Sequence, residues 1–548
     1  GGPGGCTSER AAAYRVPTEG GGGFQRRQGG TGTPARAEGG GTMASGGPGA
    51  ALKRSWRRLR RRPVGTQVGA LVVAVAVVVG AVYAATASSS TKASGSTGTQ
   101  TSTLGLGRPS GIGVNQASTS SRGVTATSIT VAFPVSNTAS LSSNFGFAGD
   151  TEFAAQPAAI HTYVNAINAA GGINGRKIKP LIVNFDATNE AEMRALCKQW
   201  TEGSPPVFAV VDGLGSYYGD NELCVTQEGH TPFIGQWTTV TNWTEQGAPY
   251  LWWTGPDDSE ELATLVAWGK STGLLGPSRR LGIVVGDRTS DQVALNDYLL
   301  PDLRIAGIAK PLIETIPTSV TDTASVTAAA PLVVQRLKAA RVDSVIPLIP
   351  FNSFFPFLSF ENQQRYYPKL LLSDYESSIT VALGLIPVPY EQGLDDQEGI
   401  TVETLGGTDA PIPESEGGYN PAVNSCYDTW KAHNKPTSTV SPYIEEQGPI
   451  VSWCQAIRLF ATAATLAGPD LNRRTFVQSM AKIQNFPGTL SPVLSYGPNR
   501  YAGPTEYQVV ELHNNIPPSS LCVPTYTGRP QGTCWHVIQG WQPLVTTP

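Results

Sequence analysis

The stretch INAAGGINGRKIKPLIVNFDATN, residues 167–189, places two glycine-rich reversals between a helical pattern and an apolar run. Gly171 supplies the left-handed backbone that ends a helix, and Asn174 and Gly175 supply the positive φ angles of a tight turn. The apolar run over 181–185 is typical of a strand that is buried on both faces. The stretch therefore predicts a helix joined at close range to a strand of a parallel sheet.

The helix before these turns is predicted by its apolar spacing. Phe153, Ile160, Val164 and Ile167 fall on one stripe, and Asp150 is a suitable N-cap. The alternation continues on both sides of this unit and indicates a parallel sheet with helices on both faces. Further strands are predicted over 128–134, 206–213 and 231–236, and further helices over 189–202 and 222–228.

A second series of strands and helices follows. Helices are predicted over 259–273, 291–307 and 328–342, and strands over 279–287, 343–350 and 368–374. The fold class is therefore predicted as α/β, with two doubly wound parallel-sheet lobes joined by a hinge. Lobe 1 is predicted over 123–253 and lobe 2 over 254–388, while 389–515 supplies elements to both lobes and 516–548 is a Cys-bracketed tail without an assignment.

The beginning of the 548-residue chain is basic, whereas the rest is acidic. Residues 1–62 carry a net charge of +9 and the remainder carries −12. We predict that 1–62 is a disordered basic segment on the cytoplasmic side, with synthesis starting at Met43. Residues 88–122, rich in Ser, Thr and Gly, are predicted to be a flexible linker.

The segment 63–87 between them is uncharged and apolar. Its run from 64 to 87 is long enough to span a bilayer, and the basic cluster before it places the C-terminal part outside the cell. We expect an uncleaved transmembrane anchor. The alternative is a signal segment, with secretion after cleavage at Ala87.

Cysteine usage agrees with an oxidising compartment outside the cell, because an even number of cysteines lies beyond the linker. Nearest neighbours in order are expected to form disulfides: Cys197 with Cys224, Cys426 with Cys454, and Cys522 with Cys534. No metal site is expected, because the chain has no CxxC and its five histidines are dispersed.

The sequence lacks the motifs of the common enzyme classes. The stretch GLGSYYG, 213–219, has Leu214 where a nucleophile elbow needs glycine, and no P-loop occurs. The acidic part beyond the linker also has no basic cluster for nucleic acid. We therefore expect a protein that is not an enzyme, needs no cofactor and binds no nucleic acid.

The loops at the carboxyl ends of the predicted strands have an unusual composition. Loops 134–149, 213–219 and 235–243 carry hydroxyls, aromatic rings and glycines but almost no charge. Ligands of open α/β sheets bind at such carboxyl ends. Backbone amides and hydroxyls can hold a carboxylate, and aromatic rings can enclose an apolar side chain, so the loops favour a small zwitterion or another small polar solute.

Several of these motifs together resemble the leucine/isoleucine/valine-binding protein family, which has the type I periplasmic-binding fold and serves ABC importers. The matching stretches are ITVAFPVS at 129–136, the Phe-Gly pair at 145–146, AINAAGGINGRKI at 166–178, FAVVDGLGS at 208–216 and LGIVVGD at 281–287. The resemblance covers residues 123 to about 515. It implies two lobes, joined by three crossovers, that close on a ligand.

The resemblance also implies ligand-binding residues. Ser216 is expected to hold the ligand carboxylate, and Thr239 to contact both carboxylate and ammonium, with the backbone carbonyl near Trp237 as an acceptor. Phe145 from lobe 1 and Phe351 from lobe 2 are expected to cover the ligand. Either Asp374 or Glu376 is expected to pair with the ammonium group.

Two departures from the family pattern bear on anchoring and specificity. No cysteine follows the apolar segment, so a peptide anchor would replace the family's lipid anchor. The stretch GDRTSDQ, 286–292, lacks the tyrosine expected after the first strand of lobe 2, which leaves amino-acid specificity open.

The predicted function is an extracellular, membrane-tethered solute-binding protein that delivers a small ligand, such as a branched-chain-like amino acid, to ABC permease subunits. Two alternatives remain. One is a receptor ectodomain that signals ligand through a partner, and the other is a wall-associated scaffold with a degenerate cleft. Fold resemblance alone does not separate them.

Overall fold

The computed structural model describes residues 113–136, 151–186, 189–213, 215, 217, 220–236, 241–308, 310–319, 322–375, 397–402, 420–434, 447–516 and 532–545. These residues belong to one compact unit, Leu106–Pro548. The predicted basic segment 1–62, the apolar segment 63–87 and most of the linker lie outside the described residues, so those expectations stay predictions.

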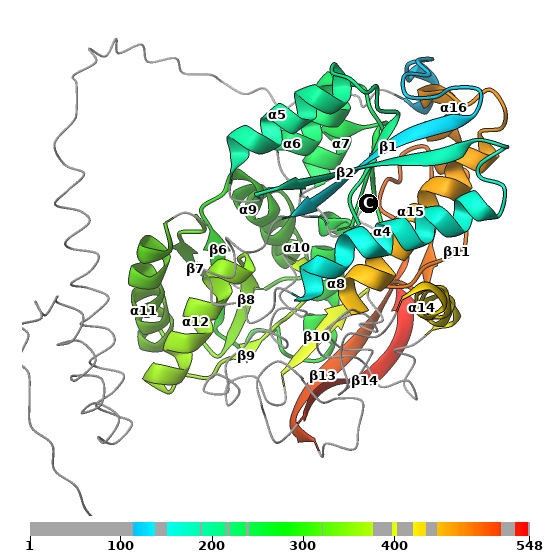
Figure 1. The fold of residues 1–548 in the computed structure, drawn as a ribbon. Helices are drawn as coiled ribbons and strands as arrows, with labels where there is room; N and C mark the ends of the chain where they lie inside the picture. Colours follow the sequence, from blue (N-terminus) through cyan, green and yellow to red (C-terminus); the bar gives the residue numbers. More distant parts are fainter. Residues whose placement is uncertain are drawn as a thin grey trace, which may run out of the picture. The chain divides into compact units, whose positions relative to one another are not determined.

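Lobe 1 is a parallel sheet of five strands in the order β2-β1-β3-β4-β5 (Figure 1). The strands are β1 (Ser128–Ser136), β2 (Lys177–Phe185), β3 (Ala209–Val211), β4 (Phe233–Gly235) and β5 (Leu251–Trp253). The helices between them are α4 (Thr151–Ala169), α5 (Glu190–Thr201), α6 (Asp220–Leu223), the π-helix η2 (Cys224–Glu228) and α7 (Thr241–Gly247).

The opening helix–turn–strand prediction is confirmed. Helix α4 ends before Gly171 and Gly172, which have φ angles of 112° and 74°, and the Gly172 N–H donates to the Ile167 carbonyl. A Cβ on Gly172 would lie 2.2 Å from the Arg176 carbonyl oxygen, so no larger residue fits this turn. The Asn168 amide then bonds both backbone groups of Ile178 and fixes the start of β2 against the end of α4.

The two faces of this sheet are covered by different parts of the chain. Val131 and Phe133 of β1 face a core built with α4 and with three later helices, α14 (Pro421–His433), α15 (Gln447–Leu466) and α16 (Arg473–Met480). Ala132 faces the opposite side, where α5 and η2 pack. This alternation along β1 is the period-two pattern of a strand that is buried on both faces.

Lobe 2 has a four-stranded parallel sheet in the order β7-β6-β8-β9. The strands are β6 (Leu281–Gly286), β7 (Leu312–Ile316), β8 (Ser344–Leu348) and β9 (Lys369–Leu370). Helices α11 (Thr323–Ala339) and α12 (Phe351–Gln364) cover one face; α8 (Asp258–Ser271), α9 (Thr289–Val293), the π-helix η3 (Ala294–Leu299) and α10 (Leu300–Ile305) cover the other.

Strand β7 was not predicted. It is an edge strand in which Ile313 is 39% exposed and Glu314 is buried beside Arg336. Its short mixed pattern lacks the continuous apolar run that identified the inner strands. A short edge strand is the element that hydrophobic periodicity detects least well.

The chain passes three times between the lobes. The first crossover lies between β5 and α8; the second between β10 (Glu398–Thr401) and α14; the third between β12 (Val493–Leu494), which pairs with β11 (Phe486–Pro487), and β13 (Glu506–Ile516). Backbone bonds join the first crossover to the third, since the Trp253 N–H donates to the Tyr501 carbonyl over 2.8 Å and Gly503 donates to Trp253 over 3.1 Å. The predicted two-lobed α/β fold is confirmed.

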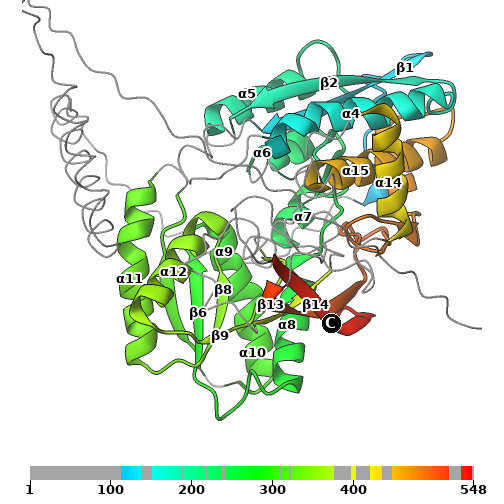
Figure 2. The same ribbon diagram turned by 60° about the horizontal axis from the view of Figure 1, so that its bottom comes forward.

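The C-terminal tail, which the sequence left unassigned, contributes a strand to lobe 2. Strand β14 (Gly532–Pro543) pairs antiparallel with β13, which pairs with β10 (Figure 1, Figure 2). Trp535 of β14 is fully buried in the core beneath α11 and α12 together with Val510 and Leu512. Packing of this tryptophan explains why the tail folds on this lobe.

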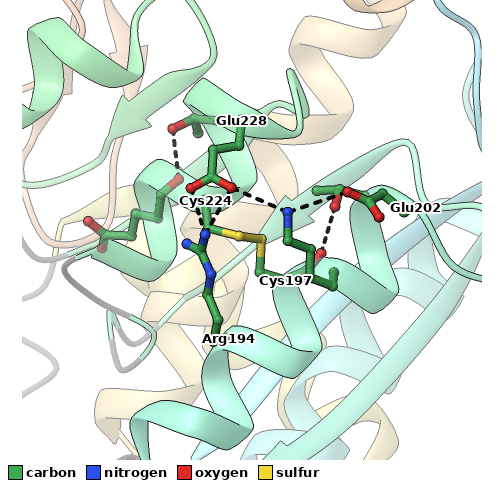
Figure 3. A network of polar contacts seen from close by, with 9 residues as sticks. Arg194, Cys197, Glu202, Cys224 and Glu228 are labelled. Carbon is green, nitrogen blue, oxygen red and sulfur yellow. Dashed lines mark hydrogen bonds and ion pairs between the residues drawn. A yellow bond between two sulfur atoms is a disulfide. The ribbon is translucent and has the colours of Figure 1, made fainter.

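Two of the expected disulfides are confirmed. Cys197–Cys224 joins α5 to η2 with a Cα separation of 6.2 Å, and Cys426–Cys454 joins α14 to α15 with 6.0 Å. Figure 3 shows the first of them beside an ion pair in which Arg194 Nη2 donates to both carboxylate oxygens of Glu228, at 2.7 and 2.9 Å. Cys522 and the side chain of Cys534 lie outside the described residues, so the third pair stays a prediction.

Residues 114–122, which the sequence placed in the linker, pack on lobe 1. Val114 and Ala117 are buried in its core, and the Arg474 guanidinium donates to the Ala117 carbonyl over 2.7 Å. The neighbouring Arg473 is 4% exposed and donates to the carbonyls of Gly229 and His230, at 3.0 and 2.9 Å. Arg473 thus ties α16 to the turn before β4.

The variant Arg473→Met is expected to lower the free energy of unfolding by about 2 kcal/mol, because it leaves buried carbonyl groups without donors. Burial lowers the pKa of Arg473 to about 10, so the side chain is still charged at neutral pH. Denaturant unfolding would measure the change. The matched control is Arg304→Met on the exposed face of α10, which should change stability by less than about 0.5 kcal/mol; equal losses would contradict this role of Arg473.

Candidate functional site

The carboxyl ends of all parallel strands gather at one edge of each sheet, which we call the carboxyl edge of lobe 1 or lobe 2. In lobe 1 this edge includes Ser136, Gly213 and Gln236, and in lobe 2 it includes Gly286 and Ile349. Helices return from these edges, so their N-terminal N–H groups also lie there. Ligands of open α/β sheets bind at this position.

Most of the predicted ligand-binding residues lie outside the described residues. These are Phe145, Ser216, Trp237, Thr239 and Glu376. Phe351 is the first residue of α12, at the carboxyl edge of lobe 2, but its side chain is not described. Asp374 is thus the one predicted site residue whose side chain can be placed, and the other assignments stay predictions.

The described neighbours of Ser216 show how its loop is held. Asp212, which follows β3, is fully buried and accepts a hydrogen bond from the Tyr217 N–H over 2.7 Å. The Tyr217 hydroxyl in turn donates to the Met193 carbonyl of α5 over 2.5 Å. Gly215 has a φ angle of 62°. The Asp212 carboxylate therefore holds Tyr217 close to the end of β3, at the carboxyl edge of lobe 1.

The loop that contains Thr239 leads into α7, which reaches both the hinge and lobe 2. The Thr241 hydroxyl donates to the Asp257 carboxylate over 2.6 Å, and the same carboxylate caps α8 through the Ser259 N–H. Trp243 of α7 packs against the lobe 2 core. Burial raises the pKa of Tyr298, on η3, to about 12, and a hydrogen bond with Thr241 opposes that shift. The two lobes therefore meet at α7.

At the carboxyl edge of lobe 2, three described charged side chains are bonded within the chain. The Arg288 guanidinium makes a bidentate ion pair with Asp291, at 2.9 and 2.6 Å, and the Tyr375 hydroxyl donates to Asp291 over 2.9 Å. A Cβ on Gly286 would lie 2.0 Å from the Asp291 carboxylate, so only glycine allows this approach. Asp287 accepts from both the backbone N–H and the hydroxyl of Thr318.

Asp374 is buried and bonded to the chain. It is 5% exposed and accepts hydrogen bonds from the Thr401 hydroxyl, over 2.9 and 3.0 Å, and from the Val402 N–H, over 2.7 Å. These contacts hold the start of the second crossover. The structure thus places Asp374 beneath the carboxyl edge of lobe 2, where its carboxyl group has backbone and hydroxyl partners.

Glu261, in the first turn of α8, forms a pair of buried carboxyl groups with Asp374. The Tyr375 N–H donates to Glu261, which is 1% exposed. Burial is the main cause that raises the pKa of Glu261 to about 8, and the Asp374 carboxyl raises it further. Burial likewise raises the pKa of Asp374 to about 7. Burial therefore favours the protonated, uncharged form of both carboxyl groups.

Asp374 was among the predicted site residues, whereas its partner Glu261 and the buried Gln156 were not. Gln156 is fully buried on α4, on the same stripe as Ile160 and Val164. A polar residue in an apolar helical stripe was the signal that could have found it. Glu261 gave no such signal, because acidic residues in the first turn of a helix are already explained by the helix dipole.

A surface groove of about 740 Å³ lies elsewhere on lobe 1, between the C-terminal half of α4 and α14. Asn424, Asp428 and His433 line it. Ala166, which also lines the groove, is near the end of α4 and therefore near the amino ends of the strands, away from the carboxyl edge. The groove is therefore a separate surface feature.

The described residues form neither a metal site nor a membrane-spanning helix. No group of three or more His, Cys, Asp or Glu side chains in those ranges could hold a metal ion. None of the helices described is both long and apolar enough to cross a membrane.

Comparison with known proteins identifies the fold. The family model described as periplasmic binding protein matches residues 140–384. No curated protein sequence matches the chain.

Three solved structures illustrate the similarity. A fatty acid ABC transporter substrate-binding protein from Thermomonospora curvata is 15% identical, with a TM-score of 0.54, over 77% of this chain and 93% of the other. An ABC transporter solute-binding protein from Rhodopseudomonas palustris BisB5, in complex with 3,4-dihydroxybenzoic acid, is 13% identical, with a TM-score of 0.53, over 77% and 99%. A leucine-binding protein from Thermotoga maritima MSB8 is 12% identical, with a TM-score of 0.51, over 71% and 96%. The resemblance predicted from the motifs is confirmed.

Proposed function

Because this chain has the type I periplasmic-binding fold of the leucine/isoleucine/valine-binding protein family, we propose that it is the solute-binding protein of an ABC importer. Its ligand is a small polar solute, such as an amino acid, held between the carboxyl edges of the two lobes. The family consists of substrate-binding proteins, and we propose no catalytic activity. The single observation that carries this proposal is the pair of parallel-sheet lobes joined by three crossovers.

The mechanism we propose is closure of the hinge around the ligand. A ligand that contacts both lobes favours the closed form by the difference between its affinities for the two states. A micromolar ligand would supply about 8 kcal/mol in total. At the hinge, the backbone bonds of Trp253 join the first crossover to the third. An ion pair of 2.6 Å joins Arg500 of the third crossover to Glu260 of α8.

Ser216→Ala and Thr239→Ala are each expected to weaken ligand binding by about 1 kcal/mol, because each removes a hydrogen bond to the ligand. Calorimetric titration with the ligand found by a solute screen would measure the change. Thr127→Ala, at the exposed amino end of β1, is the matched control and should leave affinity unchanged. Unchanged affinity in both site variants would remove these two residues from the proposed site.

We further propose that the protein is tethered to the membrane through residues 64–87 and delivers its ligand to ABC permease subunits. The support is the uncharged apolar run that follows a basic cluster, together with two disulfides formed in the described part. Fractionation of the native cells tests this tether. Recovery of the full chain in the membrane fraction is expected, whereas a soluble form beginning at Ser88 would show cleavage after Ala87 instead.

A further inference from the structure

Five amide side chains have a buried polar atom without a hydrogen-bond partner in the described part of the chain. They are Gln156, Gln236, Asn242, Asn352 and Gln455. Buried polar groups in native proteins are nearly always bonded, so each such group needs an explanation. All of them except Gln455 lie at the carboxyl edges of the two lobes, as their positions in the elements show.

Gln156 lies beneath the carboxyl edge of lobe 1. Helix α4 ends beside the amino end of β2, where Asn168 bonds Ile178. Gln156 is about 18 Å earlier along the helix, which places it at the opposite end of the strands. It faces the sheet, because it shares the buried stripe of Ile160, and neither its Nε2 nor its Oε1 has a partner in the described part.

Gln236 lies on the same face of the same sheet. Ile234 of β4 belongs to the core beneath α4 and α15, and Gln236 follows two residues later, so it points the same way. The ring of Trp453 marks this level on α15, because a Cβ on Gly213, just after β3, would lie 2.6 Å from it. Trp453 Nε1 likewise lacks a partner in the described part. Gln156, Gln236 and Trp453 thus lie on one face of the sheet, toward its carboxyl edge.

Lobe 2 has an unpaired acceptor at its own carboxyl edge. Asn352 is the second residue of α12, directly after the carboxyl end of β8, and it is 3% exposed. Its Nδ2 donates to the Thr318 carbonyl over 2.8 Å, so the orientation of the amide is set by a backbone acceptor. The Oδ1 atom is then an acceptor without a donor in the described part. Asn242, the second residue of α7, has an Oδ1 atom of the same kind.

Four charged groups that the structure describes at these edges have partners within the chain. Arg288 is paired with Asp291, Asp287 with Thr318, and Asp374 with Thr401 and Val402. Uncharged amides provide both donors and acceptors but cannot offset the cost of taking a charge out of water. The unmet hydrogen-bonding atoms of the described residues at these edges are therefore suited to an uncharged guest.

We propose that the ligand is an uncharged solute with several hydrogen-bond donors and acceptors, such as a polyol or a simple amide, and that Gln156, Gln236 and Asn352 determine this specificity. This inference rests on the proposed function and replaces the amino acid by a neutral solute in the same site. In the ligand-free form, internal waters would occupy the same hydrogen-bonding positions.

A solute screen on the full chain, purified in a mild detergent, tests this class. The probes are D-ribose, myo-inositol and propionamide as neutral solutes, and leucine, glutamate and lysine as charged ones. A rise in unfolding temperature with a neutral probe only, confirmed by calorimetric titration, is expected. A rise with charged probes only would overturn this inference and leave the proposed function intact, whereas no rise with any probe would count against both.

Two variants then test the residues. Gln156→Met keeps the side-chain volume, and Asn352→Ala removes the acceptor of lobe 2; each should weaken the neutral ligand about three- to tenfold. Gln156→Met should also raise the stability of the ligand-free protein, because it removes unmet polar atoms from the core. The matched control is Gln363→Leu, exposed on α12. Altered stability with unchanged affinity in both variants would mean a structural role and would overturn the assignment.

Discussion

The free energy of unfolding is expected to fall by several kcal/mol as the pH rises from about 4 to about 8, through the buried pair Glu261 and Asp374. Both groups have raised pKa values in the folded protein, about 8 and about 7, against ordinary values near 4 in the unfolded chain. The folded state therefore binds more protons over this range. The stabilisation is complete below about pH 4 and is lost as the pH passes the folded pKa values.

Urea unfolding of wild type and Glu261→Gln at several pH values would isolate this contribution. The variant cannot ionise at this position, so its stability should depend less on pH between about 4 and 8, and it should exceed the wild type most at the upper end. Glu190→Gln, an exposed residue in the first turn of α5, is the control and should keep the wild-type slope. Equal slopes for all three proteins would contradict the raised pKa of this pair.

The double variant Cys197→Ala/Cys224→Ala is expected to lose about 3 to 4 kcal/mol of stability. The disulfide spans 27 residues, and its removal restores the conformational entropy of that loop in the unfolded chain. Both cysteines are fully buried, and Met193 and Trp200 pack in the same core. Denaturant unfolding under non-reducing conditions is the appropriate measurement.

The ion pair beside this disulfide provides the matched control. Arg194 and Glu228 are 45% and 44% exposed, so Arg194→Met should cost less than about 1 kcal/mol. Comparing the two losses of stability distinguishes the disulfide from the solvent-exposed ion pair, which both join α5 to η2 (Figure 3). A loss from Arg194→Met equal to that of the cysteine variant would contradict this division.

The sequence predicted most of the fold because its inner strands and turns carry strong local signals. The apolar run 181–185 and the glycines 171, 172 and 175 defined one unit, and its repetition defined the lobes. Edge strand β7 was missed because two of its five residues are exposed to solvent. Strand β14 was missed because its anchor, Trp535, has a partner core far away in the sequence.

The candidate site was less predictable for a physical reason. Loop residues such as Ser216 and Thr239 were chosen by resemblance, since hydroxyl side chains are as often helix caps as ligand contacts. The pairing of Glu261 with Asp374 depends on contacts between α8 and the end of β9, which no local pattern contains. Gln156 is a polar residue in an apolar helical stripe. Only the structure shows that its amide is buried and lacks a partner in the described part.

Hydrogen–deuterium exchange, with and without the solute that most raises the unfolding temperature, tests the central claim most directly. A ligand held between the lobes should slow exchange at both carboxyl edges, in peptides covering 212–220 and 236–242 of lobe 1 and 349–354 and 371–376 of lobe 2. Slower exchange in one lobe alone, or only at the groove between α4 and α14, would contradict a ligand gripped by both lobes.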